Sequence, residues 1–164
     1  MVSAREIAEA RAIAAAVCDP EIPVLTLDDL GVLRDVRAVP NGGIEVDLTP
    51  TYSGCPALEV MRDDVTSALQ RRGYANVRVR MVLAPAWTTD WMSDQGRRKL
   101  HEYGIAPPGG VAAAGCQGAR PAGVACPQCG SAHTAELSHF GSTPCKALFR
   151  CGGCREPFDH FKPH

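Results

Sequence analysis

Cys126-Pro127-Gln128-Cys129-Gly130 and Cys151-Gly152-Gly153-Cys154 decide the fold of the C-terminal part of the chain. Two Cys-x-x-Cys turns with 21 residues between them are typical of a tetrahedral zinc site, because both sulfurs of a turn can reach one metal ion. Four protein thiolates leave no open coordination position, so a structural rather than a catalytic zinc is expected. An iron–sulfur cluster on the same cysteines is the alternative.

The segment around these turns, residues 125–164, is predicted to be a small metal-dependent module. A segment this short buries too little apolar surface to fold alone, so the metal is expected to supply much of its folding free energy. Residues 134–138 and 147–150 are expected to be strands of a ribbon. Cys145 is a fifth thiol here, either packed or a substitute ligand for iron. The predicted core consists of the four phenylalanines of the chain: Phe140, Phe149, Phe158 and Phe161.

A change of composition separates this module from the N-terminal part. Residues 107–124 are rich in proline and glycine, and Arg120 is their one charge, which predicts a flexible linker. Cys116 lies in this linker and has no predicted role. The chain is therefore divided into an α+β domain over residues 1–106, the linker over 107–124 and a four-cysteine zinc-ribbon-like module over 125–164.

The N-terminal domain is predicted to be a small α-β-β-α-β unit. Ser3 and Glu6 form a possible capping box for a first helix, which ends before Asp19-Pro20. Thr26 to Gly31 is expected to be a short capped turn. Later elements follow from hydrophobic periodicity: strands over 32–39 and 44–49, a helix over 56–72, a strand over 77–83, and a short helix over 93–103 that closes the domain.

Overall composition excludes several classes of function. The chain has 164 residues and a formal net charge of −1, which argues against a mainly electrostatic nucleic-acid binder. No apolar run is long enough for a membrane helix, and no signal peptide is visible. Eight cysteines without a secretory signal favour metal binding over disulfides, so a cytoplasmic location is expected.

Cys55 is the candidate reactive residue of the N-terminal domain. Pro56 is suited to the first helical position, which puts Cys55 near the N-cap, where unpaired amides favour a thiolate. Gly54 is expected to leave its sulfur uncovered. The alternative is a small cysteine buried under a helix cap. A nucleophilic enzyme, such as a thioesterase-like activity on a coenzyme A ester, is a weaker alternative, since nothing marks His101 as a base.

Trp87 and Trp91 follow the third predicted strand and are the two tryptophans of the chain. They could be a hydrophobic lid on the small core. They could also form a partner-binding patch, because aromatic side chains anchor protein interfaces.

Several motifs together resemble a known family. Asp19-Pro20-Glu21-Ile22-Pro23, Leu30-Gly31-Val32 and Thr49 to Pro56 are similar to iron–sulfur assembly factors of the SufT type, as is the segment from Pro85 to Trp87. The tail motifs from Cys126 and from His139 to Cys151 narrow the resemblance. The chain thus resembles the PaaD family, the D subunits encoded with the ring-1,2-phenylacetyl-CoA epoxidase of aerobic bacterial phenylacetate breakdown.

This resemblance implies a role in the maturation of a metal centre. Cys55 matches the family's reactive cysteine and would be a transient ligand of an iron–sulfur cluster or metal, while Asp19 and Glu21 match its acidic loop. The implied partners are the oxygenase and reductase subunits of the epoxidase and the iron–sulfur assembly machinery. The chain lacks a di-iron helix pattern and a dinucleotide fingerprint, so no catalytic activity of its own is expected. A non-catalytic docking component of the epoxidase complex is the alternative.

Overall fold

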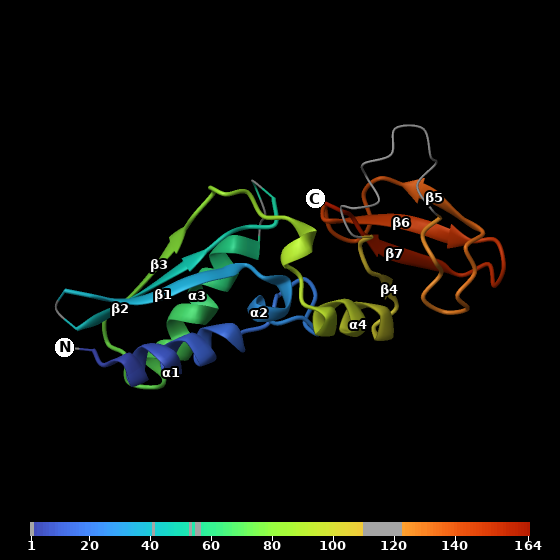
Figure 1. The fold of residues 1–164 in the computed structure, drawn as a ribbon. Helices are drawn as coiled ribbons and strands as arrows, with labels where there is room; N and C mark the ends of the chain where they lie inside the picture. Colours follow the sequence, from blue (N-terminus) through green and yellow to red (C-terminus); the bar gives the residue numbers. More distant parts are fainter. Residues whose placement is uncertain (1, 41, 53, 55–56, 110–122) are drawn as a thin grey trace. The chain divides into compact units, whose positions relative to one another are not determined.

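The computed structural model describes residues 2–40, 42–52, 54, 57–109 and 123–164. The chain forms two compact units, Met1–Trp87 and Thr88–His164. The elements of each unit are labelled in Figure 1. Cys55, Cys116 and the predicted linker, apart from 107–109 and 123–124, lie outside the described residues.

The first unit contains a three-stranded sheet with the order β1-β2-β3. Strand β1 (Leu33–Val39) pairs antiparallel with β2 (Gly43–Leu48), and β2 pairs parallel with β3 (Val77–Met81). Parallel neighbours need a crossover connection, which α3 (Ala57–Gln70) provides. The predicted α-β-β-α-β order is confirmed, with one short helix added before the first strand.

The predicted caps place the two N-terminal helices. Helix α1 (Ala4–Ala15) begins with the capping box of Ser3 and Glu6, in which each side chain accepts from the other residue's amide. The added helix α2 (Leu27–Leu30) has the same box between Thr26 and Asp29 and ends at Gly31 with φ 69°. This left-handed conformation favours glycine and turns the chain directly into β1.

The two faces of the first sheet differ in chemistry. Ile44, Val46 and Leu48 alternate along β2 and are fully or almost fully buried. Helix α1 contacts β1 and β2, α3 contacts β3, and the two helices pack against each other. Figure 1 shows α1 and α3 on the same side of the sheet. The apolar core of the first unit therefore lies between this sheet face and the helices.

The opposite face carries a network of charges. Asp47 of β2 accepts hydrogen bonds from Arg37 Nη1 at 2.7 Å and from Arg80 Nε at 2.9 Å. Arg37 also pairs with Glu45, and Glu45 and Asp47 are both only 7% exposed. The hydrogen bonds from Arg37 lower the pKa of Asp47 against the effect of burial. The arginines of the two outer strands thus cover and neutralise the acids of the central strand.

The second unit contains a four-stranded sheet with the order β4-β7-β6-β5. Strand β5 (Thr134–Ser138) pairs antiparallel with β6 (Lys146–Cys151), and β6 pairs antiparallel with β7 (Pro157–Phe161). Strand β4 (Ile105–Ala106) adds to β7 in parallel. The two predicted ribbon strands are present, and β4 and β7 were not expected.

Helix α4 (Asp94–Glu102) belongs to this second unit. It contacts β4, whose pairing with β7 connects it to the ribbon. The 3-10 helix η1 (Thr89–Trp91) is also attached, because the Thr89 amide donates to the His164 carbonyl at 3.1 Å. The boundary between the two compact units therefore lies after Trp87. The sequence had instead predicted that residues 88–106 belong to the first domain.

The predicted aromatic core of the ribbon is only partly correct. Phe158 and Phe161 are buried, and the Phe149 and Phe158 rings stack with centroids 5.8 Å apart. Phe140, in contrast, is 65% exposed, with Lys162 Nζ 4.6 Å from its ring centroid. It lies in the connection between β5 and β6, outside the strand that carries the buried Phe158 and Phe161 side chains.

None of the helices in the described part of the chain combines the length and the hydropathy that a membrane crossing requires.

Candidate functional site

The four cysteines of the two Cys-x-x-Cys turns converge on one point. Cys126 Sγ lies 3.7 Å from Cys154 Sγ, and Cys129 Sγ lies 3.6 Å from Cys151 Sγ. All four sulfurs lie within 4.8 Å of one another. Tetrahedral zinc with bonds of about 2.3 Å separates its ligand sulfurs by roughly 3.8 Å. The four-cysteine cluster therefore has the dimensions to bind a metal ion.

Two turns of the same kind hold these sulfurs. In the first, the Cys126 amide donates to the Ser131 carbonyl at 2.9 Å, and Gly130 has φ 73°. In the second, the Cys151 amide donates to the Glu156 carbonyl at 3.0 Å, and Arg155 has φ 68°. Each turn thus ends in a left-handed residue four positions after its first cysteine. Cys151 is also the last residue of β6, so the sheet positions the second turn.

Backbone amides prepare Cys151 to bind as a thiolate. The Cys154 and Gly153 amides donate to Cys151 Sγ at 3.5 and 3.3 Å. These bonds, the Cys154 amide first, lower the pKa of Cys151 to about 6, although burial opposes the shift. The pKa of Cys154 is shifted the other way. A hydrogen bond from the Glu156 amide lowers this pKa, but burial and the neighbouring thiols together raise it above the ordinary thiol value. A bound metal ion would displace the protons that the remaining thiols hold.

The cluster does not include the other candidate ligands of the module. Among the described residues, these four cysteines are the one group of three or more His, Cys, Asp or Glu side chains placed to share an ion. Cys145 is buried elsewhere, with its Sγ 3.0 Å from Thr143 Oγ1. His160 is buried, and its Nδ1 lies 3.2 Å from the Ala106 carbonyl oxygen.

The segment that carries Cys55 connects β2 to α3, between Leu48 and Ala57. It leaves the carboxyl end of a strand in a parallel β-α-β unit, a place where ligand sites are common in α/β proteins. Thr49 is 2% exposed, and its Oγ1 has no hydrogen-bond partner in the described part of the chain. Gly54 has φ 107°, a conformation that favours glycine. Cys55 itself lies outside the described residues.

The acidic pair of the predicted transfer site lies in the turn after α1. Asp19 is 8% exposed, and its Oδ1 accepts from the amides of Glu21 at 2.7 Å and Ile22 at 2.8 Å. Asp19 therefore holds the Asp-Pro-Glu-Ile-Pro turn in shape. The role of Asp19 and Glu21 in cluster or metal transfer stays a prediction.

The two tryptophans differ in their surroundings. Trp87 is 5% exposed and its Nε1 donates to the Leu30 carbonyl at 2.8 Å, so its indole is part of the first unit's interior. Trp91 is half-buried and belongs to η1 in the second unit. A partner-binding role of Trp87 and Trp91 stays a prediction.

The charge network on the first sheet was missed at the level of sequence. Its charged residues lie on three strands that become neighbours only after folding. In the folded sheet, Arg37 on β1 pairs with Glu45 on β2, and Asp47 on β2 pairs with Arg80 on β3. The alternation Glu45-Val46-Asp47 beside Arg78-Val79-Arg80 was the available signal.

Comparisons with known proteins agree with this two-part structure. Residues 8–81 match the family of iron-sulfur cluster assembly proteins, and residues 113–162 match the PaaD zinc beta ribbon domain. A protein of Escherichia coli (strain K12), provisionally named as the D subunit of 1,2-phenylacetyl-CoA epoxidase, is 48% identical over 157 residues. That alignment covers 96% of this chain and 93% of the relative.

Two further comparisons concern the first part of the chain. An Fe-S protein maturation auxiliary factor of Porphyromonas gingivalis (strain ATCC BAA-308 / W83) is 33% identical, over 51% of this chain and 80% of its own length. The crystal structure of a domain of unknown function, DUF59, from Bacillus anthracis has a TM-score of 0.53 at 28% identity. The match covers 57% of this chain and 90% of the Bacillus anthracis domain. This chain therefore belongs to the PaaD family, the D subunits of 1,2-phenylacetyl-CoA epoxidase, with an iron–sulfur-assembly domain followed by a zinc ribbon.

Proposed function

We propose that this chain is an accessory component of the phenylacetyl-CoA epoxidase system that assists the maturation of a metal centre in partner subunits. One observation carries the proposal: a chain similar over nearly its full length to an epoxidase D subunit has an iron–sulfur-assembly domain over residues 8–81. The acceptors are the oxygenase and reductase subunits, and the cargo is an iron–sulfur cluster or its iron.

Cys55 is the exchangeable ligand in this proposal. It lies within the matched range 8–81, in the connection between β2 and α3. A single protein thiolate holds a cluster less firmly than four thiolates and can exchange it with a partner's ligands. The buried Thr49 hydroxyl, which lacks a partner among the described residues, and the left-handed Gly54 lie in the same connection.

The ribbon holds a structural zinc ion in this proposal. Sulfur separations of 3.6 and 3.7 Å suit tetrahedral zinc, and the turn amides favour the thiolate form of Cys151. When bound, zinc would connect the two turns without redox chemistry. Cys126, Cys129, Cys151 and Cys154 would all be occupied, so transfer would be left to the first unit.

The experiment compares Cys55→Ser with a matched control, Cys18→Ser. Cys18 is an exposed free thiol of the same unit. Both variants are produced beside the partner subunits under iron limitation, and iron and acid-labile sulfide are measured in the purified partners. We expect Cys55→Ser alone to lower partner metal content, while its own zinc content and circular dichroism match those of Cys18→Ser.

Equal metal content in partners matured with wild type and with Cys55→Ser would overturn the maturation role. If the chain then still co-purified with the epoxidase in fixed stoichiometry, it would be a docking component of the complex. The co-purification readout therefore separates the two roles in one experiment.

A further inference from the structure

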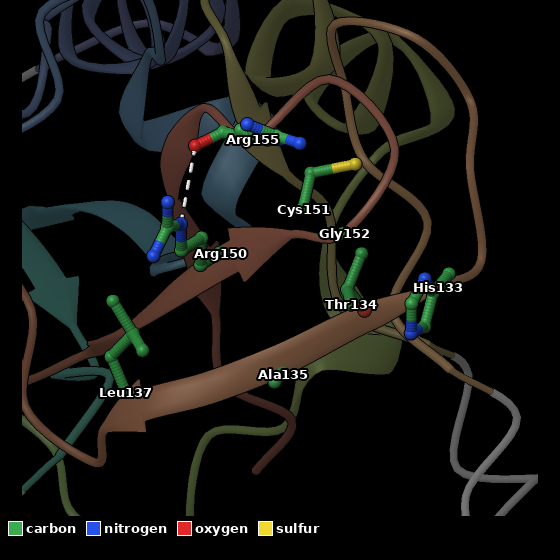
Figure 2. Close-up of a pocket in the computed structure, with 8 residues that line it drawn as sticks. All are labelled: His133, Thr134, Ala135, Leu137, Arg150, Cys151, Gly152 and Arg155. Carbon is green, nitrogen blue, oxygen red and sulfur yellow. Dashed lines mark hydrogen bonds between the residues drawn. The ribbon is translucent and has the colours of Figure 1, made fainter.

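A second candidate site adjoins the ligand cluster on the ribbon. A pocket of about 350 Å³ lies along the edge strand β5, the end of β6 and the second Cys-x-x-Cys turn. Figure 2 shows the side chains that line it, with Arg150 and Leu137 toward one end and His133 toward the other. Neither the metal cluster nor the proposed maturation role uses these three side chains.

The pocket has a basic lining. Arg150, Arg155 and His133 contribute to it, and none of its lining residues is acidic. Arg150 Nε donates only a long bond of 3.4 Å, to the Arg155 carbonyl. Within the described part of the chain, neither guanidinium forms an ion pair. Arg37 and Arg80 of the first unit, in contrast, both bind Asp47.

Rigid elements hold these basic groups in place. Arg150 lies near the end of β6, where it pairs with Ala135 on β5 and with Pro157 on β7. Arg155 is the left-handed residue that ends the second turn. The Gly152 amide donates to the His133 carbonyl at 2.7 Å, and a Cβ at Gly152 would overlap the His133 imidazole. Little conformational freedom of the backbone would be lost when a ligand binds.

An apolar surface lies beside the charges. Leu137 is 57% exposed and Ala135 is exposed, and both line the pocket. A ligand that matches this lining carries an oxyanion for the guanidinium groups and an apolar group for Leu137. Arginine binds carboxylates through paired N–H donors, and the pairing gains geometric specificity.

We propose that this pocket docks an acidic segment of a partner protein, in which a carboxylate side chain lies next to an apolar one. The carboxylate binds to the guanidinium groups that Arg150 and Arg155 contribute to the lining, and the apolar side chain packs on Leu137. This inference goes beyond the maturation role and does not depend on it. The competing explanation is that the two arginines only offset the negative charge of a metal held by four thiolates.

The experiment uses the full-length, zinc-loaded chain and two capped synthetic peptides. One peptide alternates glutamate with leucine, and the other has glutamine in place of each glutamate. Binding is measured by calorimetry at low and at high salt, together with inorganic phosphate as a third probe. We expect the acidic peptide to bind at least ten-fold more tightly than the glutamine peptide, and to lose affinity as salt rises.

Three variants locate the binding. Arg155→Gly suits the left-handed backbone and removes one guanidinium, and Arg150→Gln removes the other. Arg98→Gln, on the exposed side of α4, makes the same change of net charge outside the pocket. We expect each pocket variant to bind the acidic peptide at least ten-fold more weakly than wild type, and Arg98→Gln to bind it less than two-fold more weakly. All three variants should retain zinc.

Each other outcome overturns the proposal. If Arg98→Gln lost as much affinity for the acidic peptide as the pocket variants, the binding would be a general effect of net charge. Pocket variants that release zinc but still bind the peptide would show that the arginines serve the metal. Phosphate that competes at the same pocket with higher affinity than the peptide would show a small-anion site instead of a protein-docking site.

Discussion

The Sγ atoms of Cys129 and Cys151 lie 3.6 Å apart although 22 positions separate them in the chain. Cys129 belongs to the turn before β5, and Cys151 ends β6, so this approach closes the ribbon at one end. The adjoining core cluster consists of Ala106, Cys126, Cys151 and Phe158, with Val124 and Phe149 packed against it. Two of its four buried members are ligand cysteines. This part of the second unit's core and the four-cysteine cluster therefore share residues.

Cys129→Ser is expected to unfold the ribbon without affecting the first unit. Cys129 is exposed, so serine creates no cavity, but a hydroxyl is a poor replacement for a thiolate ligand. Loss of the metal removes several kcal/mol from the free energy of unfolding of the second unit. Elemental analysis should show lost zinc, and amide exchange should accelerate in β5 to β7 while β1 to β3 stay protected. Full zinc content in this variant, with Cys18→Ser as the control, would contradict the four-ligand site.

Local sequence signals were sufficient to predict most of the first unit. The capping box of Ser3 with Glu6 depends on residues three positions apart, and it is present. The capped turn expected from Thr26 to Gly31 is also present, as the short helix α2. The strand alternation of Ile44 to Leu48 and the helical stripe of α3 were recognised for the same reason. The cysteine spacing similarly predicted a four-sulfur cluster, because two turns and one ion determine its geometry.

Features that depend on distant pairing could not be predicted in this way. Strand β4 has two residues and exists only because it pairs with β7, about 50 positions later in the chain. That pairing also assigns α4 to the second unit. Phe140 was expected in the core because it is aromatic, but the connection after β5 leaves it exposed.

Asp47→Asn is expected to destabilise the first unit by about 1.5–3 kcal/mol, because charge-assisted hydrogen bonds from two arginines are lost. The Arg37 bonds lower the pKa of Asp47 in the folded state. Its contribution is therefore present above the ordinary carboxyl pKa and is lost as pH falls through the lowered folded value. Amide exchange of β1 to β3 measures the effect. Asp63→Asn, on an exposed residue of α3, is the control; an equal effect there would contradict a specific role of the network.

His160 is expected to make the second unit sensitive to mild acid. Burial lowers the pKa of His160 below its ordinary value, although its contact with the Ala106 carbonyl opposes this. The unfolded chain therefore takes up the proton first as pH falls, and stability present above about pH 6.5 is lost toward the folded pKa. His160→Gln keeps a hydrogen-bond donor but cannot titrate. Its free energy of unfolding should fall less between about pH 7 and pH 5 than that of wild type. Zinc release contributes to both proteins, so identical pH slopes would contradict the role of His160.

Trp87→Phe separates a core role of this residue from a partner-binding one. Phenylalanine keeps an aromatic ring in the interior but leaves the Leu30 carbonyl without its donor, so the first unit should lose about 1–2 kcal/mol of stability. Amide exchange in β1 and α2 measures that loss. Co-purification with the epoxidase subunits should be unchanged, because the indole is only 5% exposed and offers a partner little surface. Lost co-purification with unchanged exchange would instead make Trp87 a contact residue. Trp91→Phe, tested in parallel, examines the more exposed tryptophan of the pair.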